Sequence, residues 1–75
     1  MAYNKSMIIF NIKKTKGLIL SYKVLLKAQE FKYASNPSEQ TAKSIEYYEK
    51  VISTYEDRLE SLEADLDDVN NKYTK

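Results

Sequence analysis

The stretch IEYYEKVISTYEDRLESLEADLDDVNNKY, residues 45–73, decides the fold expected for this chain. Its apolar side chains recur in alternating steps of three and four residues without a break. That spacing places them on one stripe of an α-helix and is typical of a heptad seam that packs against a partner helix. The seam, which we expect to join subunits of an oligomer, contains Ile45, Tyr48, Ile52, Tyr55, Leu59, Leu62, Leu66, Val69 and Tyr73.

The residues before this stretch predict where the helix begins. Asn36 can cap it, Pro37 has a φ angle suited to the first helical position, and Glu39 can reach back to the cap. Neither Gly nor a further Pro follows to interrupt the helix. We therefore expect a turn over 35–37 and one long helix over about 37–73.

The first half of the chain predicts a short strand followed by a helix. Residues 7–14, MIIFNIKK, are rich in β-branched and aromatic residues that alternate between two faces, which favours a strand. Thr15 can then cap a helix over about 16–34, with a stripe formed by Leu18, Ile19, Tyr22, Leu25, Leu26 and Tyr33. Two alternatives stay open, a β-hairpin over 7–24 and one continuous helix from the start of this region.

The helix over about 16–34 has a second apolar side, formed by Leu20, Val24, Ala28 and Phe31. A helix that is apolar on two faces is usually buried between two layers. One further helix per chain cannot cover both faces, so we expect a homodimer or a higher oligomer.

The composition excludes several classes of function. The chain has 75 residues, no Cys, no His and one Gly, so it has no disulfides, Cys/His zinc sites, His-based or thiol catalysis, or phosphate-binding glycine loops. We expect a single small domain that is not an enzyme and that uses no cofactor, metal or small-molecule substrate. The longest apolar runs are too short to span a membrane, so we expect a cytoplasmic protein without a membrane partner.

The net charge of +1 hides an asymmetry between the two halves. Residues 1–34 carry seven Lys and one Glu, or +6, whereas residues 35–75 carry five positive and ten negative side chains, or −5. Such a split indicates that the halves pair with each other or that the basic half meets an acidic partner.

Two segments resemble the ribbon-helix-helix (Arc-like) repressors. The pattern Met7-x-x-Phe10-Asn11-Ile12-Lys13 with the apolar positions up to Leu26 is similar to their strand and first helix. Residues 46–55, EYYEKVISTY, are similar to their second helix. A core of this kind would cover residues 7–55. We expect a flexible basic arm over 1–6 before it and, because the second helix is longer than that fold needs, a coiled-coil extension over 56–75.

The resemblance also implies a function, a dimeric DNA-binding repressor that lays a β-ribbon in the major groove. Base contacts would then come from Ile9, Asn11 and Lys13. Phosphate contacts would come from Lys5, Lys14, Lys16, Asn36 and Ser38. The alternative is a non-catalytic helical protein-interaction module, such as a small phage-encoded inhibitor of a host protein.

Overall fold

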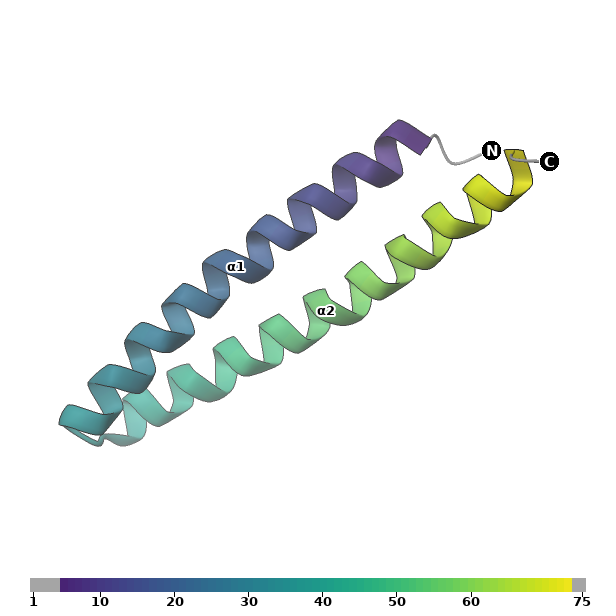
Figure 1. The fold of residues 1–75 in the computed structure, drawn as a ribbon. Coiled ribbons are helices and arrows are strands. Elements are labelled where there is room, and N and C mark those ends of the chain that lie inside the picture. Colours follow the sequence, from purple (N-terminus) through teal and green to yellow (C-terminus); the bar gives the residue numbers. More distant parts are fainter. Residues whose placement is uncertain (1–4, 74–75) are drawn as a thin grey trace.

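The computed structural model describes residues 5–73, which form a hairpin of two long helices (Figure 1). Helix α1 spans Lys5–Ser35, helix α2 spans Glu39–Tyr73, and residues 36–38 connect them. The helices run antiparallel, and the hairpin measures 57 × 19 × 14 Å. The prediction of a mainly α fold with a long second helix is confirmed.

The inner face of α1 has a heptad seam of its own. Ile8, Ile12 and Ile19 are buried there, and Thr15 is buried in the same row, where its hydroxyl donates a hydrogen bond of 2.7 Å to the Asn11 carbonyl. The row continues in steps of three and four through the half-buried Tyr22 and Leu26. Two such rows can interlock along their whole length, as in a coiled coil.

The predicted seam of α2 faces this row. Ile52 is buried, and the other described members are half-buried, namely Ile45, Tyr48, Tyr55, Leu59, Leu62, Leu66 and Val69. The helix that covers them is therefore α1 of the same chain.

The prediction of a strand over 7–14 is wrong, and α1 begins at Lys5 rather than near residue 16. Of the alternatives from the sequence, the continuous helix is the one that the structure shows. The β-branched residues of this segment disfavour a helix by only a few tenths of a kcal/mol each. Burial of Ile8 and Ile12 against α2 contributes roughly 1.5–3 kcal/mol for each side chain and outweighs that preference.

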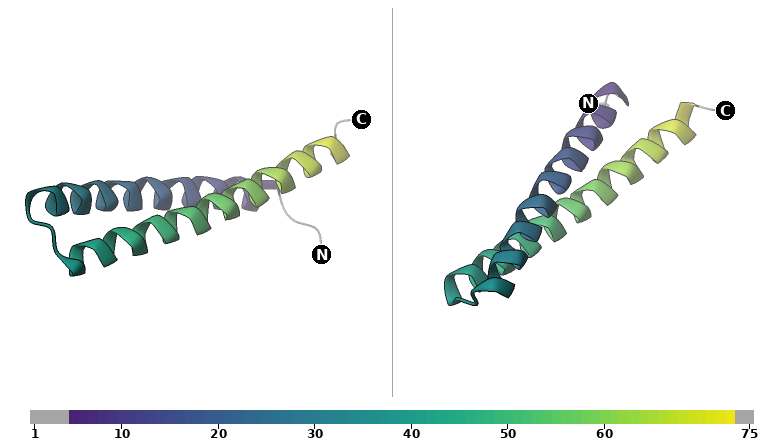
Figure 2. Two further views of the ribbon diagram at one scale, coloured as in Figure 1. Left: turned by 90° about the horizontal axis from the view of Figure 1, so that it is seen from below. Right: turned by 60° about the vertical axis from the view of Figure 1, so that its left-hand side comes forward.

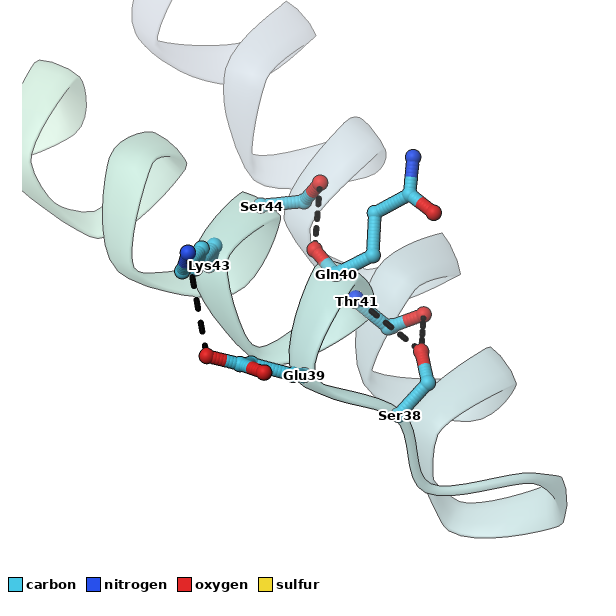
Figure 3. Close-up of polar contacts among 6 residues, drawn as sticks. All are labelled: Ser38, Glu39, Gln40, Thr41, Lys43 and Ser44. Atoms are coloured by element: carbon cyan, nitrogen blue, oxygen red, sulfur yellow. Dashed lines mark hydrogen bonds and ion pairs between the residues drawn. The ribbon is translucent and has the colours of Figure 1, made fainter.

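The cap of α2 is Ser38 rather than Asn36 (Figure 3). The Ser38 hydroxyl accepts a hydrogen bond of 3.2 Å from the Thr41 backbone N–H and lies 2.9 Å from the Thr41 hydroxyl. Glu39 follows in the first turn, where its charge favours the helix dipole, and its carboxylate lies 3.7 Å from the Lys43 ammonium. The helix consequently starts two residues later than expected.

Replacing Ser38 with Ala should lower the free energy of unfolding by about 1 kcal/mol, because the Thr41 N–H loses its acceptor. Ser38→Asp should preserve the cap and the stability. Thermal unfolding followed by far-UV circular dichroism measures both. Equal melting of the Ala variant and the wild type would contradict Ser38 as the cap.

Residues 56–73 belong to α2, as the prediction of one long helix requires. Leu62 and Arg58 line the same hollow as Asn11 and Leu18, so this part of α2 packs on the first half of α1. Two further views show the first turns of α1 and the last turns of α2 at the same end of the hairpin (Figure 2). The predicted arm over 1–6 and extension over 56–75 include residues 1–4 and 74–75, which lie outside the described residues.

Truncation after Arg58 should therefore unfold the hairpin at 25 °C. It removes the half-buried Leu59, Leu62, Leu66 and Val69, at roughly 1–2 kcal/mol each, and the sum of about 4–8 kcal/mol is comparable to the whole stability of a small domain. Truncation after Asn70 serves as the control and should keep the fold. A cooperative melt of the shorter chain would show that the first half of α1 does not need α2.

Candidate functional site

The three residues predicted to contact DNA bases do not share a face. Successive residues of an α-helix are rotated by about 100°, so Asn11 points nearly opposite to Ile9 and Lys13. Asn11 and Lys13 are exposed and Ile9 is half-buried. On a strand the three would have lined one surface, and on α1 they do not.

The five predicted phosphate contacts divide into two groups. Lys5, Lys14 and Lys16 are exposed on α1. The other two belong to the connection between the helices, where the Asn36 N–H donates to the Lys32 carbonyl at 2.9 Å and the Ser38 hydroxyl caps α2. Among these five, the lysines carry the positive charge, and none of the three forms an ion pair within residues 5–73.

The middle of the hairpin holds a cluster of tyrosines. The rings of Tyr22 and Tyr55 stack with centroids 5.9 Å apart, and those of Tyr22 and Tyr48 lie 6.0 Å apart. Tyr47 meets Tyr48 edge-on at 5.5 Å. Tyr47 itself is 59% exposed, so the cluster reaches from the helix interface to the surface.

A groove of about 410 Å³ runs beside this cluster, and we call it the tyrosine groove. It adjoins a second hollow of about 200 Å³ between the helices, because Tyr55 and Arg58 line both. Asn11 and Lys14 of α1 reach into that second hollow. The tyrosine groove is lined by Tyr22, Tyr47, Lys50, Val51, Thr54, Tyr55 and Arg58.

The electrostatics of this side of the hairpin are unusual for a chain with an acidic second half. Among the described residues that line the two hollows there is no Asp or Glu. Within residues 5–73, none of the cations Lys14, Lys50 and Arg58 forms an ion pair. The residues three and four positions from Arg58 along α2 are Thr54, Tyr55, Ser61 and Leu62.

Several carboxylates of α2 lie instead on its other flank. The helical rotation places Glu56 and Glu60 roughly opposite to Arg58. There Glu56 lies 3.7 Å from the Lys23 ammonium of α1, with both side chains about half exposed. The predicted pairing of basic and acidic halves therefore occurs on one side of the hairpin and leaves cations unpaired on the other.

A second candidate surface is the outer face of α1, the side turned away from α2. Its large apolar side chains are 62–69% exposed, namely Met7, Phe10, Leu20, Val24 and Phe31. Leu20, Val24 and Phe31 belong to the second apolar side predicted from the sequence, and the structure leaves them uncovered. Gly17 lies in the same stripe, and a Cβ added there would meet no atom within 4 Å.

The tyrosine groove was not predicted from the sequence, because its wall comes from both helices and depends on their register. The only sequence signal was the exposed position of Tyr47 outside the seam. In residues 5–73 no cluster of His, Cys, Asp or Glu could hold a metal ion. Over the same range no helix is long and apolar enough to cross a membrane.

Comparison with known proteins finds no family model, curated protein or solved structure that matches this chain.

Tyr22→Leu should destabilise the hairpin by about 0.5–1.5 kcal/mol, since Tyr22 contacts the rings of both Tyr48 and Tyr55. The chain has no Trp, so the tyrosine band of the near-ultraviolet circular dichroism spectrum reports tyrosine packing, and its signal should fall. Tyr33→Leu is the control, because Tyr33 is 41% exposed and stacks on no described ring. Equal losses of stability and of near-ultraviolet signal in the two variants would contradict a packed cluster around Tyr22.

Proposed function

We propose that this protein is a non-catalytic helical interaction module that pairs with a second copy of itself through the outer face of α1. The observation that carries the proposal is the row of five large apolar side chains, all more than 60% exposed, along one side of α1. Contiguous apolar surface of this kind marks an interaction site. The residues of α1 that face α2 are separate from this row, so the hairpin cannot cover it.

The spacing of this row suits a partner helix. Phe10, Gly17, Val24 and Phe31 are each seven residues apart, and Leu20 lies between the second and third. A row with that period follows the helix axis and can interlock with a second helix. Gly17 disfavours the helix by about 1 kcal/mol relative to Ala, and no described atom occupies the space beside it. A second backbone can approach closely at that point.

A second copy supplies what the single hairpin lacks. Only Ile8, Ile12, Ile19 and Ile52 form the buried apolar core of the described residues, which is small for a stable domain. Five side chains that each expose on the order of 100–150 Å² would bury about 1,200 Å² in a symmetric pair. That area is at the lower end of the range for stable protein–protein interfaces.

The row also fits an antiparallel pair. Its midpoint falls between Leu20 and Ser21, so a twofold axis there places Phe10 opposite Phe31 of the other copy, and Gly17 opposite Val24. The small Gly17 then faces the larger Val24, and the two Phe side chains face each other. The lysines of α1 would repel each other at the rim, but exposed charge pairs contribute at most about 1 kcal/mol each. Apolar burial, at about 25 cal/mol per Å², outweighs that repulsion.

The DNA-binding repressor stays a prediction, and no comparison with known proteins bears on it. Its β-ribbon requires a strand over 7–14, where α1 is helical. The alternative, a protein-interaction module, needs only an exposed apolar helix face. The outer face of α1 therefore supports the interaction module better than the ribbon-based repressor.

Changing both Phe10 and Phe31 to Ser should convert a dimer of about 18 kDa, twice the 8.8 kDa chain, into a monomer. Sedimentation at micromolar concentration measures the mass, and Tyr47→Ser, an exposed aromatic residue outside the outer face, is the control. Dimerisation should strengthen with salt, because salt screens the repulsion between lysines. A wild-type chain that sediments as a monomer with a cooperative melt would contradict the proposal.

The chain contains no Cys, so Ser21→Cys tests the position of the twofold axis without a competing thiol. A short bis-maleimide crosslinker should join two copies at position 21. Ser53→Cys, at an exposed position of α2, should remain uncrosslinked. Efficient crosslinking at position 53 alone would show that the copies meet through α2 instead.

A further inference from the structure

We propose that the tyrosine groove binds single-stranded nucleic acid, with Tyr47 stacking on a base and Lys50, Arg58 and Lys14 contacting phosphates. This site is separate from the outer face of α1. The groove lies where α1 meets α2, whereas the outer face is turned away from α2, so both surfaces can be occupied at once.

Tyr47 is the aromatic residue of the tyrosine groove that packing between the helices does not explain. Tyr22, Tyr48 and Tyr55 are half-buried between the helices, but Tyr47 is 59% exposed. Its edge-on contact with Tyr48, at 5.5 Å and 62°, holds the ring in place at the surface. An exposed ring that is already held in position is suited to stack on a base of a single strand.

The cations of the groove are placed for a chain of phosphates. Lys50 and Arg58 are eight residues apart on α2, which is about 12 Å along the helix axis. Lys14 approaches the same side from α1, in the hollow that Arg58 also lines. All three are exposed, and no described carboxylate lines either hollow to compete with a phosphate.

The distribution of acidic residues strengthens this inference. Residues 35–75 carry ten acidic side chains, yet none of those described lines the groove or the hollow beside it, and Glu56 lies on the opposite flank, where it meets Lys23. Positive charge interleaved with aromatic rings is the combination that recognises single strands.

A single strand fits this groove better than a duplex does. The faces of duplex bases are covered by their neighbours in the stack, so the Tyr47 ring can reach a base only when the strand is unpaired. A duplex would have to bind through phosphates alone, and it would not depend on Tyr47.

Fluorescence anisotropy with a labelled oligothymidine of 15 nucleotides, titrated at 50 mM salt, tests the site. An abasic strand of the same length and a duplex are the comparison ligands. Tyr47→Leu should weaken oligothymidine binding about fivefold or more, because one stacked base is lost, and should leave the abasic strand unaffected. Tyr47→Phe keeps the ring and should bind like the wild type.

The double variant Lys50→Gln, Arg58→Gln should bind both oligothymidine and the abasic strand more weakly. It should also reduce the slope of log K against log salt by about 1.4, or 0.7 for each lost phosphate contact. Lys27→Gln, an exposed lysine outside the groove, and Tyr33→Leu are the matched controls and should change the affinity less than twofold. Far-UV circular dichroism checks that each variant keeps its helices.

Three results would overturn the inference. They are the absence of binding at 50 mM salt, a Tyr47→Leu variant that binds oligothymidine as well as the wild type, and equal affinity for the abasic strand. If duplex DNA bound as tightly as oligothymidine and Tyr47→Leu changed neither affinity, the basic flank would instead bind the phosphates of duplex DNA.

Discussion

The packing of one heptad row on another is the interaction on which the whole molecule depends. Neither helix has another described element to pack against, so residues 5–73 are held in place by this single contact between α1 and α2. The contact is thin, because four Ile residues form the buried apolar core and Thr15 and Thr41 occupy two further buried positions. Both threonines have hydrogen-bond partners, so they add no unsatisfied polar group to the seam.

The charged residues make the two sides of the hairpin different but contribute little to its stability. The Lys23–Glu56 and Lys43–Glu39 pairs are exposed and contribute at most about 1 kcal/mol each. The Lys23–Glu56 pair does, however, place an acidic residue of α2 beside a lysine of α1 on one flank, whereas the Lys43–Glu39 pair lies within α2. On the opposite flank Lys50 and Arg58 form no ion pair within residues 5–73, and no described Asp or Glu lines the groove beside them.

The sequence predicted the long helix and its seam because a period of three and four over nine positions has one interpretation. The prediction of a strand over 7–14 was wrong because Ile8 and Ile12 fit one face of a strand and one row of a helix equally well. The choice depends on α2, whose facing residues lie some fifty positions away in the chain. The predicted cap at Asn36 was wrong for a local reason. Asn and Ser are both good caps, and only the geometry of the turn selects Ser38. The tyrosine groove depends on the register of both helices, which no local pattern fixes.

The tyrosines connect the fold to this groove. Seam positions of a coiled coil are usually filled by Leu, Ile or Val, and Tyr48 and Tyr55 occupy two of them opposite Tyr22. The distance between packed helices depends on the side chains at the contact, so large rings hold the helices further apart than aliphatic residues would. The hollow that Tyr55 and Arg58 share lies beside these rings. Aliphatic residues there would pack a denser core and close the groove, so the same rings that limit the core also shape the surface next to it.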